Sequence, residues 1–343
     1  MRTVKALGVA LMALAVLAPH ARAQSLPIAL FERYLESLRQ QAGIPGLSVA
    51  IVENGRLAWD TGLGYRELER FERATADTPY PILDLSQAVS STLLLQQCLD
   101  LRYLELTDRV RRWSPQFPEL NTTVAELLEH AAPDRGFRYD ANRYANLTTV
   151  IEQCASSRYP VLLTGEFFDR LGMATTVPGH DVTDLATIRQ FPPGALDRYS
   201  TVLQRVAVPY KVDPSRRATP SDYPRASVSA ATGVVSTVRD LARFDISLDI
   251  LLAASTRQRA WENSGSMPTG LGWFVQRYNG QRLVWHFGLA RDAYSALYIK
   301  VPSRNITLIL LANSDGLAAP YNLANGDVTT SLFAQLFLKL FVS

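Results

Sequence analysis

Cysteine, histidine and lysine are scarce in this chain of 343 residues, and their scarcity excludes whole classes of site. The two cysteines, Cys98 and Cys154, and the four histidines are scattered along the chain. No H-E-x-x-H or C-x-x-C spacing occurs, so the usual protein ligands of zinc are not grouped. Glycine-rich nucleotide-binding motifs are also missing. We therefore expect no metal ion and no cofactor.

The first 23 residues have the three parts of a signal peptide. Arg2 and Lys5 give a basic start, residues 6–17 are apolar, and Ala-Arg-Ala at 21–23 matches a cleavage site. The apolar run is shorter than a bilayer-spanning helix, and no longer run follows it. A buried N-terminal helix is the alternative, but the order of the three parts favours export. We expect a periplasmic or extracellular protein of residues 24–343 without a transmembrane anchor.

The exported chain also lacks an excess of basic residues. Loss of the signal peptide removes three basic residues and no acidic one, which leaves 32 Lys and Arg against 32 Asp and Glu. No basic cluster stands out in the remainder. Because nucleic acid binding depends on neutralising phosphates with grouped cations, we expect no nucleic-acid partner.

Export leaves two alternatives for the cysteines. An oxidising compartment favours a disulfide between Cys98 and Cys154, since no third thiol competes for either of them. Two buried free thiols are the other outcome, because free cysteine is common in protein cores. The sequence does not decide between them.

Strand patterns at the two ends of the chain predict a single antiparallel sheet. Residues 47–52 and 56–62 flank Asn54-Gly55, which is the strongest short hairpin signal because a type I′ turn needs two positive φ angles. Apolar residues at helical spacing predict one covering helix near each end. The further strands are expected at 282–287, 295–301 and 306–312, and the two helices at 27–41 and 328–342.

The middle of the chain is mostly helical in its pattern. We predict an α/β (α+β) fold in which residues 24–74 and 266–343 build the antiparallel sheet part, flanked by helices. Residues 75–265 form a mostly helical insertion. Within it, the proline-rich residues 205–230 are expected to form a long surface loop.

Short motifs along the chain resemble those of the serine β-lactamase and penicillin-binding-protein family. Residues 78–82, Thr-Pro-Tyr-Pro-Ile, resemble the segment that leads to the catalytic serine. Residues 127–130, Leu-Leu-Glu-His, resemble L-L-x-H, and residues 285–288, Trp-His-Phe-Gly, contain H-x-G. Each match is weak alone, but eight matching stretches in the family's order make the chain similar to that family. The resemblance implies a serine β-lactamase/DD-peptidase fold. The other matching stretches are residues 104–110, 170–173, 232–244, 270–273 and 311–315.

The resemblance implies an S-x-x-K motif, in which a lysine one helical turn after the serine activates it. This chain has Asp84-Leu85-Ser86-Gln87 there, with Asp84 at the serine position and Gln87 at the lysine position. Aspartate cannot form the same acyl-enzyme, and glutamine exchanges no proton near neutral pH. A shift of register to Ser86 puts Val89 at the lysine position. No serine in the chain has a lysine three residues later.

The resemblance also implies a Y-x-N element and an H-x-G strand beside the nucleophile. Tyr139 matches the tyrosine, while Ala141 occupies the asparagine position and Asn142 follows it. His286 and Gly288 match the strand element, and a glycine there would let a ligand backbone approach closely. The expected binding residues are therefore Tyr139, Asn142, His286 and Gly288.

These motifs predict that four positions meet in one cleft between the sheet edge and the helical region. The positions are Asp84, Gln87, Tyr139 and His286. For Tyr139 the alternative is a packed aromatic side chain, and for His286 a strand histidine satisfied by its neighbours.

Two functions follow from the degenerate motifs. The favoured one is a catalytically inactive relative that keeps the cleft and binds a peptidoglycan-like peptide or a protein partner, because nucleophile and base act as a unit and both are missing. The alternative is an active serine hydrolase, an esterase, peptidase or β-lactamase-like enzyme, that uses Ser86 with Tyr139 or His286. A purely structural domain explains everything except the retained H-x-G strand.

Overall fold

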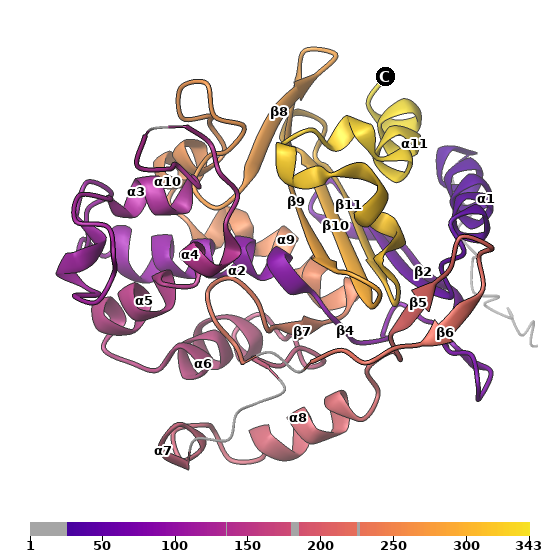
Figure 1. The fold of residues 1–343 in the computed structure, drawn as a ribbon, viewed down its shortest axis with the longest axis horizontal. Helices are drawn as coiled ribbons and strands as arrows, with labels where there is room; N and C mark the ends of the chain where they lie inside the picture. Colours follow the sequence, from indigo (N-terminus) through magenta and orange to yellow (C-terminus); the bar gives the residue numbers. More distant parts are fainter. Residues whose placement is uncertain (1–25, 135, 180–184, 225–226) are drawn as a thin grey trace, which may run out of the picture.

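The computed structural model describes residues 26–134, 136–179, 185–224 and 227–343. The expected signal peptide lies outside these residues. Within them, the main sheet has seven strands in the order β3-β2-β1-β11-β10-β9-β8 (Figure 1). The strands are β1 Gly46–Glu53, β2 Arg56–Glu67, β3 Glu72–Arg73, β8 Phe274–Tyr278, β9 Gln281–Ala290, β10 Tyr294–Val301 and β11 Ile306–Ala312.

The sheet closes by pairing the two ends of the chain. β1 lies antiparallel to β11, with Leu47 opposite Ala312 and Val52 opposite Thr307. Asn54 and Gly55 form the turn between β1 and β2, and both have the positive φ that the hairpin signal requires. The predicted antiparallel sheet built from both ends, flanked by helices, is confirmed.

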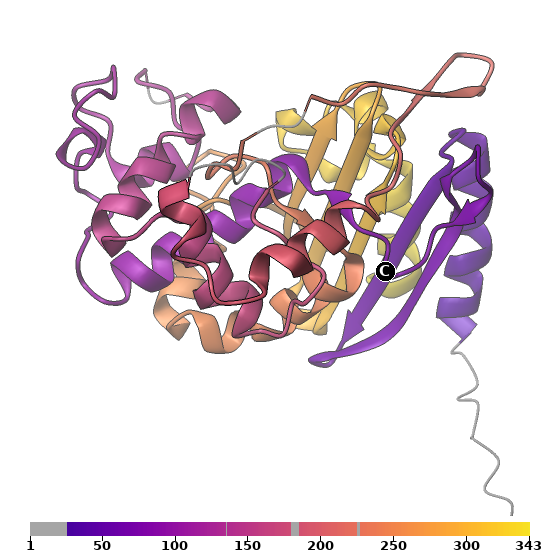
Figure 2. The ribbon, with the colours of Figure 1, turned by 90° about the horizontal axis from the view of Figure 1, so that it is seen from below.

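Alternate residues of the central strands face two separate apolar cores. Val49 and Leu310 lie in the core under α1 (Leu26–Gln41) and α11 (Leu332–Phe341). Ala50 and Leu311 lie in the other core, which the sheet shares with the helical region. Figure 2 shows the helical region and the α1–α11 pair on opposite sides of the sheet. This period-two alternation is what buries both faces of the sheet.

The helical region supplies most of the remaining elements. A second apolar-lined strand pair, β4 (Tyr80–Pro81) with β7 (Val235–Ser236), connects it to the sheet part. Its helices are α2 Ser86–Leu94, α3 Val124–Leu128, α4 Ala141–Tyr144, α5 Leu147–Ala155, α6 Tyr159–Leu162, α7 Leu185–Ile188, α8 Ala195–Leu203, α9 Val238–Leu251 and α10 Ala254–Ala260, with the short 3-10 helix η1 Leu83–Leu85 before α2.

Residues 205–230 are not one continuous loop. β5 (Tyr210–Val212) and β6 (Ala218–Pro220) pair as a small hairpin within them. The prolines obscured this pattern, but Pro220 is the last residue of β6, where a missing N–H is tolerated. The strand β8 was also missed, because its five residues are too short to show a clear period.

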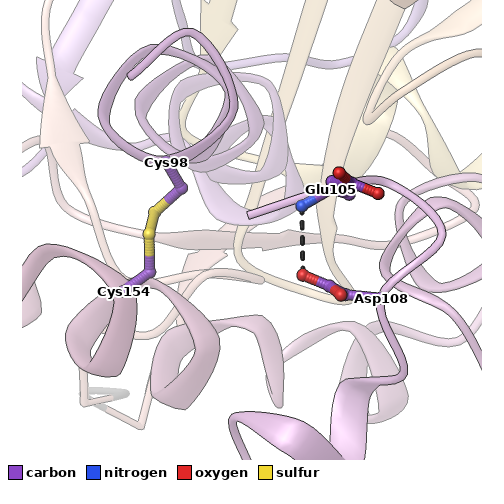
Figure 3. The surroundings of a disulfide bond; sticks show 4 residues. All are labelled: Cys98, Glu105, Asp108 and Cys154. Atoms are coloured by element: carbon purple, nitrogen blue, oxygen red, sulfur yellow. Dashed lines mark hydrogen bonds between the residues drawn. A yellow bond between two sulfur atoms is a disulfide. The ribbon is translucent and has the colours of Figure 1, made fainter. Parts of the chain in front are cut away.

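A disulfide joins Cys98 to Cys154, with Cα atoms 5.9 Å apart (Figure 3). It connects the π-helical turn after α2, Leu95–Leu99, to α5. Beside it, the Glu105 backbone N–H donates to the Asp108 carboxylate at 3.0 Å. The disulfide alternative is therefore confirmed, and it closes a loop with a sequence separation of 56 residues.

The 3-10 helix η1 is pressed against β9. A Cβ added at Gly288 of β9 would collide with the Ile82 carbonyl oxygen and would lie 2.9 Å from the Leu83 Cβ. Leu83 itself has a φ of 56°, which is strained for a bulky side chain. The space beside Gly288 is thus occupied by the chain's own η1 rather than left for a ligand.

Replacing both Cys98 and Cys154 by alanine should lower the free energy of unfolding by about 2–4 kcal/mol, because the open chain gains conformational entropy when unfolded. Urea denaturation of the oxidised wild type, the reduced wild type and the double variant measures this. The reduced wild type should resemble the variant. Equal stability of the oxidised and reduced wild type would contradict the prediction.

Gly288→Ala should destabilise the protein by about 1–3 kcal/mol, because the added methyl group meets backbone that cannot move without displacing η1. Gly165→Ala is the matched control, since a Cβ at Gly165 meets nothing within 4 Å and its φ is not positive. The control should stay within about 0.5 kcal/mol of wild type in the same denaturation experiment. If Gly288→Ala leaves the free energy of unfolding unchanged, η1 does not pack against β9 at Gly288.

Candidate functional site

Asp84 lies in η1, immediately before the first turn of α2. Its carboxylate accepts a hydrogen bond from the backbone N–H of Leu289 on β9 at 3.3 Å. The hydroxyl of Tyr139 also donates to this carboxylate. With the backbone N–H of Asp84 itself, three neutral donors hold the carboxylate between the sheet and the helical region.

Gln87 connects the first turn of α2 to the same tyrosine. Its side-chain N–H donates to the Tyr139 hydroxyl oxygen at 3.0 Å. Its carbonyl oxygen lies 2.8 Å from Nε2 of His130. Because His130 Nδ1 accepts from the Asp140 backbone N–H at 3.3 Å, the ring proton is placed on Nε2, which donates to Gln87.

These contacts form one directional chain of hydrogen bonds. His130 donates to Gln87, Gln87 donates to Tyr139, and Tyr139 donates to Asp84. The His130 ring also packs against the rings of Tyr139 and Tyr144, at centroid distances of 4.5 and 5.0 Å. Each polar group between His130 and Asp84 therefore has a partner, and none remains available as a free base.

Burial shifts the protonation equilibria of this chain. Loss of solvent raises the pKa of Asp84 to about 6, although hydrogen bonds from Leu289 and Tyr139 oppose the rise. The same loss lowers the pKa of His130 to about 3, so its imidazole is neutral at pH 7. Burial, followed by the Asp84 charge, raises the pKa of Tyr139 well above its ordinary value. At pH 7 the hydrogen-bonded chain from His130 therefore ends in the largely ionised carboxylate of Asp84.

A cavity of about 270 Å³ opens over Asp84. Asn142, expected to bind ligand, is exposed and lines this cavity. Leu289 lines it from the sheet, and Tyr223 from the segment after β6. The structure thus brings Asp84 and Asn142 to one cavity, while Gln87 and Tyr139 lie beneath it.

His286 does not join the hydrogen-bonded chain. Its side chain is buried on β9, and its Nδ1 accepts from the Phe287 backbone N–H at 3.0 Å. Burial lowers the pKa of His286 to about 4. Its ring centroid lies 5.5 Å from that of Phe274, which is 5.7 Å from that of Tyr139, so aromatic packing connects His286 to the site.

Ser86, the alternative nucleophile, is buried and does not line the cavity over Asp84. Its hydroxyl has no hydrogen-bond partner among the described residues. The described lysines lie elsewhere: Lys300 pairs with Asp245, Lys211 pairs with Asp292, and Lys339 is exposed on α11. In the described part of the chain, no group of His, Cys, Asp and Glu could hold a metal ion.

His130 is the residue of this site that sequence reasoning missed. It was noted only as the last residue of a family-like L-L-x-H stretch. The available signal was its position in a matching motif nine residues before Tyr139. Its φ of 54° is a conformation that histidine adopts rarely, and it turns the backbone at the end of α3 so that the ring faces Gln87.

Asp84→Asn should stabilise the protein at pH 7 but not at pH 4. The pKa of the Asp84 carboxyl is 3.8 in the unfolded chain and about 6 in the folded protein. Between these two pH values the unfolded state therefore binds fewer protons than the folded state. Stability contributed by Asp84 therefore falls as pH rises from about 4 to 6. The variant should gain about 1–3 kcal/mol over wild type by pH 7.

Denaturation curves for both proteins between pH 4 and 8 test this difference. The lowered pKa values of His130 and His286 destabilise both proteins towards acid, and this effect cancels in the comparison. Tyr139 and Tyr223, which also face Asp84, stay protonated over the whole range because their pKa values are raised. If the free energy of unfolding depends on pH in the same way for both proteins, the pKa of Asp84 is not raised in the folded state.

The comparisons with known proteins concern the family and the fold of this chain. The Beta-lactamase family model matches residues 31–329. A penicillin-binding protein of Bacillus subtilis is 21% identical over 323 residues, which cover 78% of this chain and 68% of that protein. The serine beta-lactamase-like protein LACTB of Mus musculus, a mitochondrial protein, is 25% identical over 132 residues, which cover 36% of this chain and 24% of that protein.

Among solved structures, the D-amino acid amidase from Ochrobactrum anthropi SV3 has a similar fold. It superposes with a TM-score of 0.74 at 19% identity, over 92% of this chain and 98% of the amidase. At this identity the likeness concerns the fold alone. The family model, by contrast, covers most of the chain, and this chain therefore belongs to the Beta-lactamase family.

Proposed function

We propose that this protein is an exported, non-hydrolytic member of the Beta-lactamase family that binds a ligand in the cavity over Asp84. The family is related to hydrolases, and its fold is retained here. The observation that carries the proposal is the hydrogen-bonded chain from His130 to Asp84, which fills the positions of nucleophile and base.

The chain of hydrogen bonds supports inactivity in two ways. Asp84 attacking an acyl group would form an anhydride, which is far less stable than the ester that a serine forms. Gln87 cannot take up a proton, and its amide is engaged on both sides by His130 and Tyr139. Nucleophilic catalysis needs a nucleophile within reach of a base, and this arrangement supplies neither.

The alternative, a hydrolase using Ser86, has less support. The Ser86 hydroxyl is buried, and no base contacts it among the described residues. Neither Tyr139 nor His286 is hydrogen-bonded to it, since Tyr139 engages Gln87 and Asp84 while His286 engages its own strand. Ser86 acts in this structure as a small packed residue at the start of α2.

Export is supported by the signal-peptide pattern and by the disulfide. A disulfide between Cys98 and Cys154 persists in an oxidising compartment such as the periplasm or the cell exterior. Across the described residues, the helices are too short or too polar to cross a bilayer. We extend the proposal to a peptidoglycan-like peptide as ligand, because the relatives include a penicillin-binding protein. A protein partner is the other candidate occupant.

The mature protein should form no covalent adduct with a fluorescent penicillin and should hydrolyse β-lactams no faster than buffer does. The reason is that the Ser86 hydroxyl is buried, does not line the cavity over Asp84 and has no hydrogen-bonded base among the described residues. Gel fluorescence and intact-mass measurement after incubation test this, with an active penicillin-binding protein as the positive control. An adduct that disappears in Ser86→Ala would overturn the inactive assignment in favour of the alternative.

A further inference from the structure

A second cavity, of about 610 Å³, adjoins the cavity over Asp84. Tyr223 lines both cavities, so the two meet at this residue. The second cavity is lined by α8, by residues 206–209 and by Tyr294 of β10. Its volume falls within the range of about 300–1,000 Å³ that small-molecule sites occupy.

The second cavity offers apolar and aromatic surface. No charged side chain is among the described residues that line it. Its buried tyrosines have their hydroxyls engaged, because Tyr294 donates to the Ala207 carbonyl oxygen at 2.6 Å and Tyr199 lies 2.7 Å from the Thr164 hydroxyl. With their hydroxyls satisfied, these tyrosines offer a ligand chiefly the apolar surface of their rings.

The cavity over Asp84, by contrast, contains a charged group. Asp84 carries the only charge among the described residues that line either cavity. The groups that donate to its carboxylate are the Leu289 N–H, its own backbone N–H and the Tyr139 hydroxyl, and all three are neutral. A carboxylate that is largely removed from water without a cationic partner is unfavourable, and a cation supplied by a ligand would relieve this.

We propose that the two cavities form one site for a small molecule that combines a protonated primary amine with an apolar body. The amine pairs with Asp84, and the body packs between α8 and Tyr294, passing the ring of Tyr223. The inference rests on the proposed function, because it assigns a ligand class to a cleft that binds without acyl transfer. The same charge repels an anionic ligand of equal shape.

Three probes that share a phenyl group and a four-carbon chain, and differ in the head group, test the head-group preference. Calorimetric titration at pH 8, where Asp84 is ionised, compares 4-phenylbutylamine, 4-phenylbutanol and 4-phenylbutanoate. The amine should bind about 10- to 100-fold more tightly than the alcohol, as a charge-assisted hydrogen bond requires. The carboxylate should bind more weakly than the alcohol.

Two variants and a control locate the two halves of the ligand. Asp84→Asn should abolish the preference for the amine over the alcohol. Ser200→Trp fills the second cavity from α8 and should weaken all three probes about equally. Thr201→Trp, on the same helix but outside the cavity lining, should leave binding unchanged.

Equal affinity of wild type for the amine and the alcohol overturns the inference, as does an amine preference that survives Asp84→Asn. Loss of amine binding in Thr201→Trp but not in Ser200→Trp overturns the placement of the apolar body. Intact-mass measurement with penicillin on the same samples separates the two proposals. An adduct refutes the non-hydrolytic function, whereas no adduct without an amine preference refutes the ligand class alone.

Discussion

The close contact between η1 and β9 determines the geometry of the whole site. Gly288 lacks the Cβ that would hold the two apart, so Ile82 and Leu83 pack directly on the strand. This contact brings Asp84 within reach of the Leu289 N–H. It also fixes the direction in which α2 begins, and therefore the position of Gln87 one turn later. The strained φ of Leu83 persists because the surrounding packing leaves no other conformation.

The hydrogen-bonded chain explains how the family's fold accommodates Asp84 and Gln87 at the positions that the resemblance assigns to the serine and the lysine. A buried polar site is stable when each donor meets an acceptor, and His130, Gln87 and Tyr139 satisfy one another in sequence. The hydrogen-bonded chain ends in Asp84, whose carboxylate has no cationic partner among the described residues. Natural proteins keep such unfavourable groups mainly at functional positions, and this is the physical basis for assigning a binding role to the cavity above it.

The two cavities take their different character from the elements that line them. The cavity over Asp84 lies where η1, β9 and α4 meet, and backbone N–H groups and short polar side chains are available there. The adjoining cavity lies under α8, whose inner face and the ring of Tyr294 are apolar. Tyr223 belongs to both because it follows the β5–β6 hairpin, which carries the chain across the site.

Much of the fold follows from local patterns in the sequence. Local patterns predicted the alternating strands at both chain ends, the turn at Asn54-Gly55 and the two covering helices. Each of these elements depends mainly on interactions between residues that are close in the sequence. The missing S-x-x-K motif is likewise a property of the sequence alone, since the positions of four lysines exclude it in any alignment.

Contacts between distant residues were decided only by the tertiary structure. The cysteines pair because the turn after α2 lies against α5, which their spacing does not reveal. His130 joins Gln87 because α3 ends beside α2, and Ser86 does not line the cavity over Asp84 because all of α2 is buried. A residue pattern specifies which face of its own element is apolar, but which other element covers that face depends on how the whole chain packs.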